Sequence, residues 1–90
     1  MEFLKEPGRI YRTDASGQTI AEVTFPAAGE GVVDIDHTFV DPSLRGQGVA
    51  GQLMQALADQ LRLERRKAVL TCSYAQKWFG EHPEYGDVLA

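Results

Sequence analysis

The chain has 90 residues, of which 43% are hydrophobic and 24% are charged, and its net charge at neutral pH is −4. These values are typical of one small soluble domain, here residues 1–90, and exclude a disordered chain or an enzyme built on a large barrel. No apolar run approaches the roughly 20 residues of a membrane span, and the acidic balance argues against nucleic-acid binding. The single cysteine excludes an internal disulfide and fits a reducing cytoplasm. With two histidines beside it, no metal site is expected.

Three strands are predicted in the first half of the chain, after a leader over residues 1–8 that is expected to be loose. The first strand is centred on residues 10–12, and a turn with Asp and Gly separates it from a second strand over residues 18–25. After a loop over residues 26–31, alternating apolar and polar side chains predict a third strand over residues 32–40. The short connections predict an antiparallel meander.

The pattern then changes to helical spacing. Pro42 ends the third strand because proline has no N–H group to donate to a sheet. A long helix is predicted over residues 48–64, since apolar residues recur at every fourth position: Val49, Leu53, Leu57 and Leu61. A fourth strand over residues 68–72 and a short helix over residues 75–81, stopped by Pro83, follow. The order βββ-α-β-α predicts an α+β fold, with one curved, mostly antiparallel sheet, one long helix and one short helix.

The loop between the third strand and the long helix carries the main functional signal. Residues 42–80 have a net charge of +4 in an otherwise acidic chain, and residues 45–51 contain three glycines. A helix start presents unpaired backbone N–H groups and a partial positive charge, and glycine lets an anion approach the backbone closely. The loop therefore suits a phosphate group. The alternative is that Gly46 and Gly48 only shape the turn.

Two familiar nucleotide-binding loops do not describe this segment. A P-loop requires Lys and then Ser or Thr after its last glycine, whereas Val49 and Ala50 follow Gly48. The spacing Gly46-x-Gly48-x-x-Gly51 matches the dinucleotide fingerprint formally. However, it follows a meander, and no second parallel strand supplies the acidic residue that binds the ribose. We interpret this match as accidental.

The loop instead resembles the acetyl-CoA loop of the GCN5-related N-acetyltransferases (GNATs), whose pattern is Arg/Gln-x-x-Gly-x-Gly/Ala. Arg45, Gly48 and Ala50 occupy the pattern positions, and strand, loop and long amphipathic helix follow in the family's order. The resemblance implies that the loop amides bind the pyrophosphate of coenzyme A, with the binding residues Arg45, Gly46, Gln47, Gly48, Val49 and Ala50. It also implies that Phe39 and Val40, at the edge of the third strand, hydrogen-bond the pantetheine arm as an added strand would.

The similarity narrows to a minimal GNAT-like subfamily whose members are about as short as this chain. Larger members have two helices between their first and second strands, and this chain lacks both. The further shared residues are His37-Thr38, Cys72 and the segment His82-Pro83-Glu84-Tyr85. The likeness covers roughly residues 8–89. Because the missing helices usually shape the acceptor pocket, the resemblance does not name the acceptor.

Cys72 and His37 are the predicted catalytic residues. Cys72 ends the fourth strand directly before a helix start, a position that favours a thiolate; the alternative is a small buried residue. The predicted alternation puts His37 on one strand face with Val33, Ile35 and Phe39. Histidine is a common general base near neutral pH, and the alternative is a half-buried packing residue.

The predicted function is binding of acetyl-CoA, or another short acyl-CoA, as co-substrate, with transfer of the acyl group to an unidentified amine or thiol. Transfer is either direct or through Cys72. Tyr74 and Tyr85 are candidate proton donors to the departing CoA thiolate, as a tyrosine is in larger relatives, or else they pack in the core. Two alternatives stay open. A non-catalytic acyl-CoA sensor or interaction module would bind CoA without turnover, and a plain interaction domain would not bind CoA.

Overall fold

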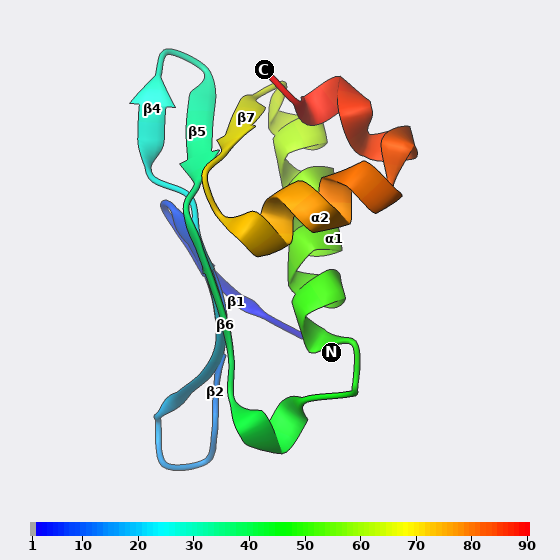
Figure 1. The fold of residues 1–90 in the computed structure, drawn as a ribbon. Coiled ribbons are helices and arrows are strands. Elements are labelled where there is room, and N and C mark those ends of the chain that lie inside the picture. Colours follow the sequence, from blue (N-terminus) through cyan, green and yellow to red (C-terminus); the bar gives the residue numbers. More distant parts are fainter. Residues whose placement is uncertain (1) are drawn as a thin grey trace.

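The computed structural model describes residues 2–90, and in it two sheets lie on one side of the molecule and two helices on the other (Figure 1). The strands are β1 (Leu4–Glu6), β2 (Arg9–Thr13), β3 (Thr19–Thr24), β4 (Ala27–Gly29), β5 (Val32–Ile35), β6 (His37–Val40) and β7 (Lys67–Leu70). The helices are α1 (Val49–Glu64) and α2 (Ser73–Glu81), and two 3-10 turns are η1 (Pro42–Leu44) and η2 (Pro83–Val88). The larger sheet has the order β1-β2-β3-β6, and the smaller sheet has the order β4-β5-β7.

The predicted α+β class and the order of the main elements are confirmed, but two short strands were missed. The prediction of a loose leader is wrong for Leu4–Glu6, which pairs with β2. Likewise Ala27–Gly29, in the expected loop, pairs with β5. Both strands are three residues long and all their residues are exposed, so no alternation of buried apolar and exposed polar residues marks them in the sequence.

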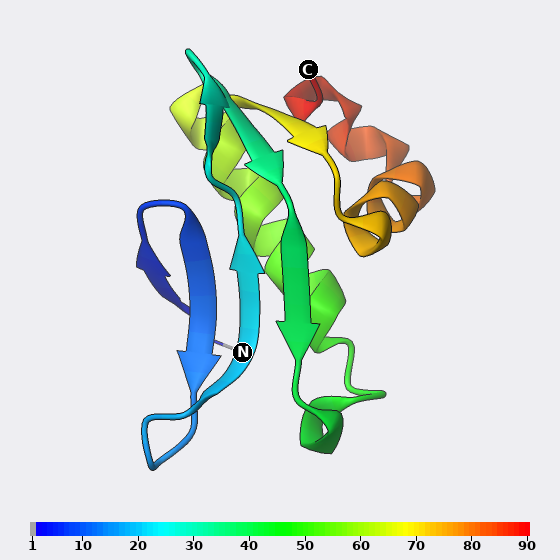
Figure 2. The same ribbon diagram turned by 60° about the vertical axis from the view of Figure 1, so that its left-hand side comes forward.

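The predicted third strand is divided between the two sheets. β5 pairs in parallel with β7, whereas β6 pairs antiparallel with β3. Asp36 lies between them in neither strand, and its N–H donates to the carbonyl of Thr24 at 3.2 Å. Figure 2 shows β6 and β7 diverging beyond this point, which we call the fork. Within residues 2–90 no strand pairs with the edge of β6 that faces the fork.

The fork also reverses which side chains face the helices. On β5, Val33 and Ile35 are fully buried. On β6, by contrast, Thr38 is half-buried, whereas His37 and Phe39 are exposed. The predicted common face for these residues is therefore wrong, because an irregularity of one residue in a strand moves all later side chains to the opposite face.

One apolar core fills the space between the sheets and the helices. From α1 it receives Val49, Leu53, Met54, Leu57, Ala58 and Leu61. From the sheets and α2 it receives mainly Ile10, Val23, Phe25, Val33, Ile35, Ala75, Trp78 and Phe79. Each large side chain buried in this way stabilises the fold by about 1.5–3 kcal/mol. The opposite side of α1 is open to solvent, and Leu63 on it is 85% exposed.

Two leucines of α1 provide a matched test of this core. Leu57→Ala should lower the free energy of unfolding by about 2–5 kcal/mol, because Leu57 is fully buried and its removal leaves a cavity. Leu63→Ala, on the same helix, should change it by less than about 0.5 kcal/mol. Urea unfolding followed by circular dichroism measures both. Equal losses for the two variants would contradict the described core.

Candidate functional site

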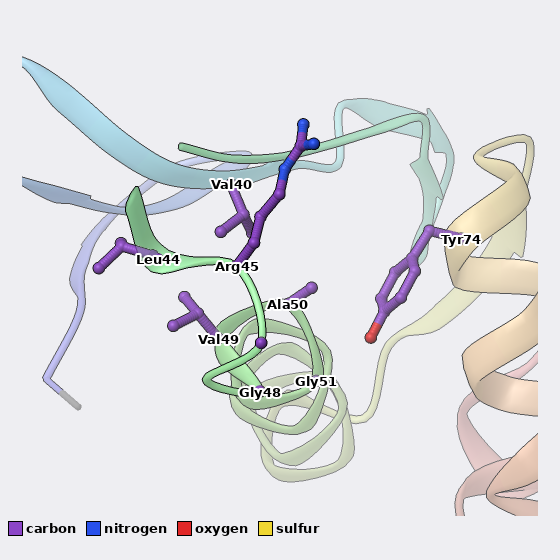
Figure 3. Close-up of a pocket in the computed structure, with 9 residues that line it drawn as sticks. Val40, Leu44, Arg45, Gly48, Val49, Ala50, Gly51 and Tyr74 are labelled. Atoms are coloured by element: carbon purple, nitrogen blue, oxygen red, sulfur yellow. The ribbon is translucent and has the colours of Figure 1, made fainter. Parts of the chain in front are cut away.

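A cavity of about 230 Å³ lies where the end of β6 meets the start of α1 (Figure 3). Its wall is formed by the end of β6, the loop, the first turn of α1 and one side chain of α2: Val40, Leu44, Arg45, Gly46, Gly48, Val49, Ala50, Gly51 and Tyr74. Most of the residues predicted to bind the cofactor are therefore brought together around one cavity. The exceptions are Phe39 and Gln47, which are not part of the wall.

The loop delivers unpaired backbone donors to this cavity. Gly46 and Gly48 have φ values of +81° and +73°, a conformation that glycine adopts without strain. The first N–H group bonded within α1 is that of Gln52, which donates to Gly48 O at 3.1 Å. The N–H groups of residues 49–51 are thus left over, and the N-cap residue Gly48 has no side chain to cap them. Together with the helix dipole, they form a site for an anionic group.

The side chain of Asp41 fixes the start of the loop, at the point where the chain leaves β6. The Asp41 carboxylate accepts hydrogen bonds from the Ser43 hydroxyl at 2.6 Å and from the Ser43 N–H at 3.0 Å. These two bonds hold the pKa of Asp41 below its usual value of 3.8. The turn η1 therefore starts at a fixed position relative to β6.

The open edge of β6 offers further backbone groups beside the cavity. The N–H of Asp41 donates to Ile20 O at 2.8 Å, and the register of β3 with β6 continues from there. Alternate residues of an antiparallel strand bond to the same neighbour. The backbone groups of Phe39 therefore face β3, and those of Thr38 and Val40 face the fork. A ligand along this edge would meet Thr38 and Val40, not the predicted Phe39.

Cys72 lies at the base of the fork, where β7 leads into α2. Its N–H donates to Ile35 O at 3.0 Å, and its Sγ is 3.5 Å from Thr38 Oγ1. The thiol is half-buried and stands at the N-cap of α2. His37 is exposed and adjacent to Thr38 on β6, so its side chain points to the other face of the sheet. The structure therefore does not bring the two predicted catalytic residues together.

The structure separates the two candidate tyrosines. Tyr74 forms part of the cavity wall, and Figure 3 shows its hydroxyl pointing from α2 toward the start of α1. Burial, and to a lesser extent the charge of Glu81, raises the pKa of Tyr74 above its usual value of 10.0. Tyr85 is no part of this wall, and its hydroxyl donates to Asp59 at 3.0 Å. Of the two tyrosines, Tyr74 is therefore the one that lies at the cavity.

Sequence reasoning did not identify Thr38, Leu44 or Gly51 as site residues. The alternation predicted for the third strand puts His37, and not Thr38, on the face of Ile35, because the fork is invisible in the sequence pattern. Gly51 follows the glycine-rich pattern directly, which was the one available signal. Within the described part of the chain, no group of three His, Cys, Asp or Glu side chains could hold a metal ion. None of its helices combines the length and apolar character needed to cross a bilayer.

The site thus combines a forked sheet with a helix start whose unpaired N–H groups lie beside an open strand edge. The family described as GCN5-related N-acetyl-transferase matches residues 10–88, which is most of the chain. The chain belongs to this family, and the predicted resemblance is confirmed.

Named relatives and solved structures are consistent with this assignment. The chain is 40% identical over 63 residues to Protein NATD1 of Gallus gallus, and equally to that of Mus musculus. The match spans 70% of this chain but only 57% of those relatives' length. A solution structure of a GCN5-like protein from Staphylococcus aureus, assigned as an N-acetyltransferase, is 29% identical and superimposes with a TM-score of 0.83, covering 99% of this chain and 87% of that one. A Klebsiella pneumoniae protein assigned as an acyl-CoA N-acyltransferase shares the fold, with a TM-score of 0.59 at 18% identity over 84% of this chain and 54% of that one.

The hydrogen bonds of Asp41 predict that the turn η1 depends on pH. Since the pKa of Asp41 is lowered in the folded protein, its charged carboxylate contributes to the turn at neutral pH. That contribution decreases as pH falls below 3.8 and is lost once pH passes the lowered pKa. The Ser43 amide resonance in NMR spectra should therefore titrate with a midpoint below 3.8. In Asp41→Asn this titration should be absent; a midpoint at or above the usual value would contradict the assignment.

Proposed function

We propose that the cavity binds the CoA part of acetyl-CoA or of another short acyl-CoA. The observation that carries this proposal is the combination of two features on one cavity: the unpaired N–H groups of residues 49–51 and the open backbone edge of β6. A pyrophosphate needs the first feature, and an extended chain with amide groups needs the second. Membership of an acyltransferase family supports this choice over other anionic ligands.

The proposed placement follows the wall of the cavity. The pyrophosphate lies against the loop and the start of α1, near the guanidinium of Arg45. The pantetheine arm runs along β6 and bonds to the backbone groups of Thr38 and Val40. Its thioester then reaches the base of the fork, close to Cys72, where a backbone N–H of β6 polarises the thioester carbonyl.

Two routes of acyl transfer are compatible with these residues. In direct transfer, the acceptor nitrogen attacks the thioester carbon, and the departing CoA sulfur takes a proton from the hydroxyl of Tyr74. In covalent transfer, Cys72 Sγ attacks first, CoA leaves as the thiol, and the new Cys72 thioester acylates the acceptor. Exchange of one thioester for another costs little free energy. His37 would act on the opposite face, where it takes the proton released by an amine acceptor.

One observation favours the non-catalytic alternative. Both helices lie on the same side of the sheets (Figure 1), so no element among residues 2–90 covers the face with His37 and Phe39 to enclose an acceptor. A sensor or interaction module would use the same cavity for acyl-CoA and would need no acceptor pocket. The enzyme hypothesis and the sensor hypothesis both predict CoA binding, and only the enzyme hypothesis predicts turnover.

CoA binding is tested by a charge placed at the helix start. Gly48→Glu should weaken acetyl-CoA binding by roughly 100-fold or more, because a carboxylate would replace the bound pyrophosphate at the unpaired N–H groups. Gly31→Glu is a matched control, since Gly31 has a φ of +71° against +73° for Gly48, and no atom lies within 4 Å of an added Cβ at either position.

Both variants should fold with similar losses of stability, because both force a side chain into the left-handed conformation. Titration calorimetry with acetyl-CoA then separates charge from strain. Binding that is unchanged in Gly48→Glu, or equally weak in both variants, would contradict the proposed pyrophosphate site.

The covalent route is tested with variants at the fork. After incubation with acetyl-CoA, mass spectrometry of the intact protein should show one acyl adduct in the wild type and none in Cys72→Ala. His37→Ala should form the adduct normally but should transfer it to an amine roughly 10²–10⁴-fold more slowly, as loss of a general base predicts.

Each result discriminates between the routes. Full turnover by Cys72→Ala would leave direct transfer with Tyr74 as the acid, and Tyr74→Phe should then reduce turnover with little change in CoA affinity. If the wild type binds acetyl-CoA but shows neither adduct nor turnover with a broad panel of amines, the sensor reading is correct.

A further inference from the structure

Trp78 presents an unpartnered polar group beside the same cavity wall. Its side chain is 5% exposed, and its indole N–H donates to none of the residues 2–90, so that N–H keeps some access to solvent. The indole nitrogen lies 3.5 Å from the point where a Cβ of Gly51 would stand, and the Tyr74 hydroxyl lies 3.8 Å from that point. Gly51 itself belongs to the cavity wall. Two hydrogen-bonding groups therefore converge on a gap that exists because residue 51 has no side chain.

The orientation of the indole is held by the segment after α2. The His82 ring stacks on Trp78 with ring centres 4.0 Å apart and planes inclined by 14°, and His82 Nδ1 lies 2.7 Å from Trp78 O. The Tyr85 ring lies 5.5 Å from Trp78, and its hydroxyl is bonded to Asp59 of α1. The segment His82–Tyr85 thus supports Trp78 by ring stacking.

Packing does not explain why residue 51 is glycine. Gly51 is the third residue of α1 and is not in the left-handed conformation. A Cβ at this position would make ordinary contacts, since the nearest atom is the Trp78 nitrogen at 3.5 Å. Alanine is also the better helix former. The missing side chain therefore reduces stability without a structural reason, as expected where space is reserved for a ligand.

We propose that this gap is a subsite for an amide carbonyl of the pantetheine arm, which accepts a hydrogen bond from the indole N–H of Trp78. The proposal rests on the proposed CoA binding and adds to it the residues that recognise the arm. The two side-chain donors in the gap, the Trp78 indole and the Tyr74 hydroxyl, are uncharged groups on aromatic rings, which suits a neutral carbonyl group. Tyr74 and Trp78 are one helical turn apart on α2, and in the arm the amide carbonyl lies a few bonds from the sulfur. The spacing of Tyr74 and Trp78 along α2 therefore matches the spacing of the sulfur and the amide carbonyl along the pantetheine arm.

Gly51→Ala tests the subsite against a second helical glycine. Gly80 in α2 is exposed and has no atom within 4 Å of an added Cβ. Both Gly51→Ala and Gly80→Ala should raise the melting temperature of the free protein by a few degrees. Only Gly51→Ala should weaken acetyl-CoA binding, by roughly 10-fold. The second ligand is 3′-phospho-ADP, a probe that contains the phosphates of CoA but no pantetheine arm, and its binding should not change in Gly80→Ala. Because the N–H of residue 51 belongs to the proposed pyrophosphate site, the discriminating result for Gly51→Ala is a larger loss of affinity for acetyl-CoA than for 3′-phospho-ADP.

Trp78→Phe removes the indole N–H while retaining an aromatic ring against His82. Loss of one hydrogen bond should weaken acetyl-CoA binding by roughly 3- to 10-fold and leave binding of 3′-phospho-ADP unchanged. Trp78 is the single tryptophan of the chain, so its fluorescence should also respond more strongly to acetyl-CoA than to 3′-phospho-ADP.

The outcomes separate this inference from the proposed function. If the wild type binds acetyl-CoA and both Gly51→Ala and Trp78→Phe bind it equally well, the subsite is wrong and the CoA site remains. Equal weakening toward both ligands would show a general disturbance of the loop and would also overturn the subsite. If the wild type binds neither ligand, the proposed CoA site is wrong and the subsite with it.

Discussion

The structure depends on one constraint: a single stretch of chain serves two sheets that diverge. Up to Ile35 the chain pairs with β7, and after Asp36 it pairs with β3 alone. This division leaves the backbone groups of two half-buried residues, Thr38 and Val40, without a strand partner. A ligand that bonds as a strand does would satisfy them. The contact between Thr38 and Cys72 closes the base of the fork and places the thiol where such a ligand would end.

Helix α1 connects this constraint to the stability of the fold. Its apolar side packs on strands of both sheets, so the core determines where the helix lies relative to the fork. The start of the helix is consequently held beside the open edge of β6, with the loop as the connection between them. Core substitutions that shift α1 would displace its unpaired N–H groups from that edge. Leu57→Ala should therefore lower the affinity for a ligand at this edge as well as the free energy of unfolding.

Local patterns in the sequence were sufficient for part of this arrangement. The helical spacing of Leu53 and Leu57 and the glycines at the start of α1 identified the long helix, the loop and the family. The fork was not predictable, because one irregular residue, Asp36, looks like any other polar position of an alternating strand. The same error placed His37 on the buried face. Gly51 and Trp78 lie close together because of the way α1 packs against α2. The spacing of residues along the chain does not predict this packing.

The candidate site reduces the stability of a chain that has little to spare. A helical glycine at position 51, an unpaired strand edge and an uncapped helix start are all unfavourable in the free protein. Small domains are stable by only about 5–15 kcal/mol, and a ligand at 100 times its dissociation constant adds about 2.7 kcal/mol. If an acyl-CoA binds as proposed, the strand edge and the helix start gain hydrogen-bond partners, and the bound protein should unfold at a higher temperature than the free protein.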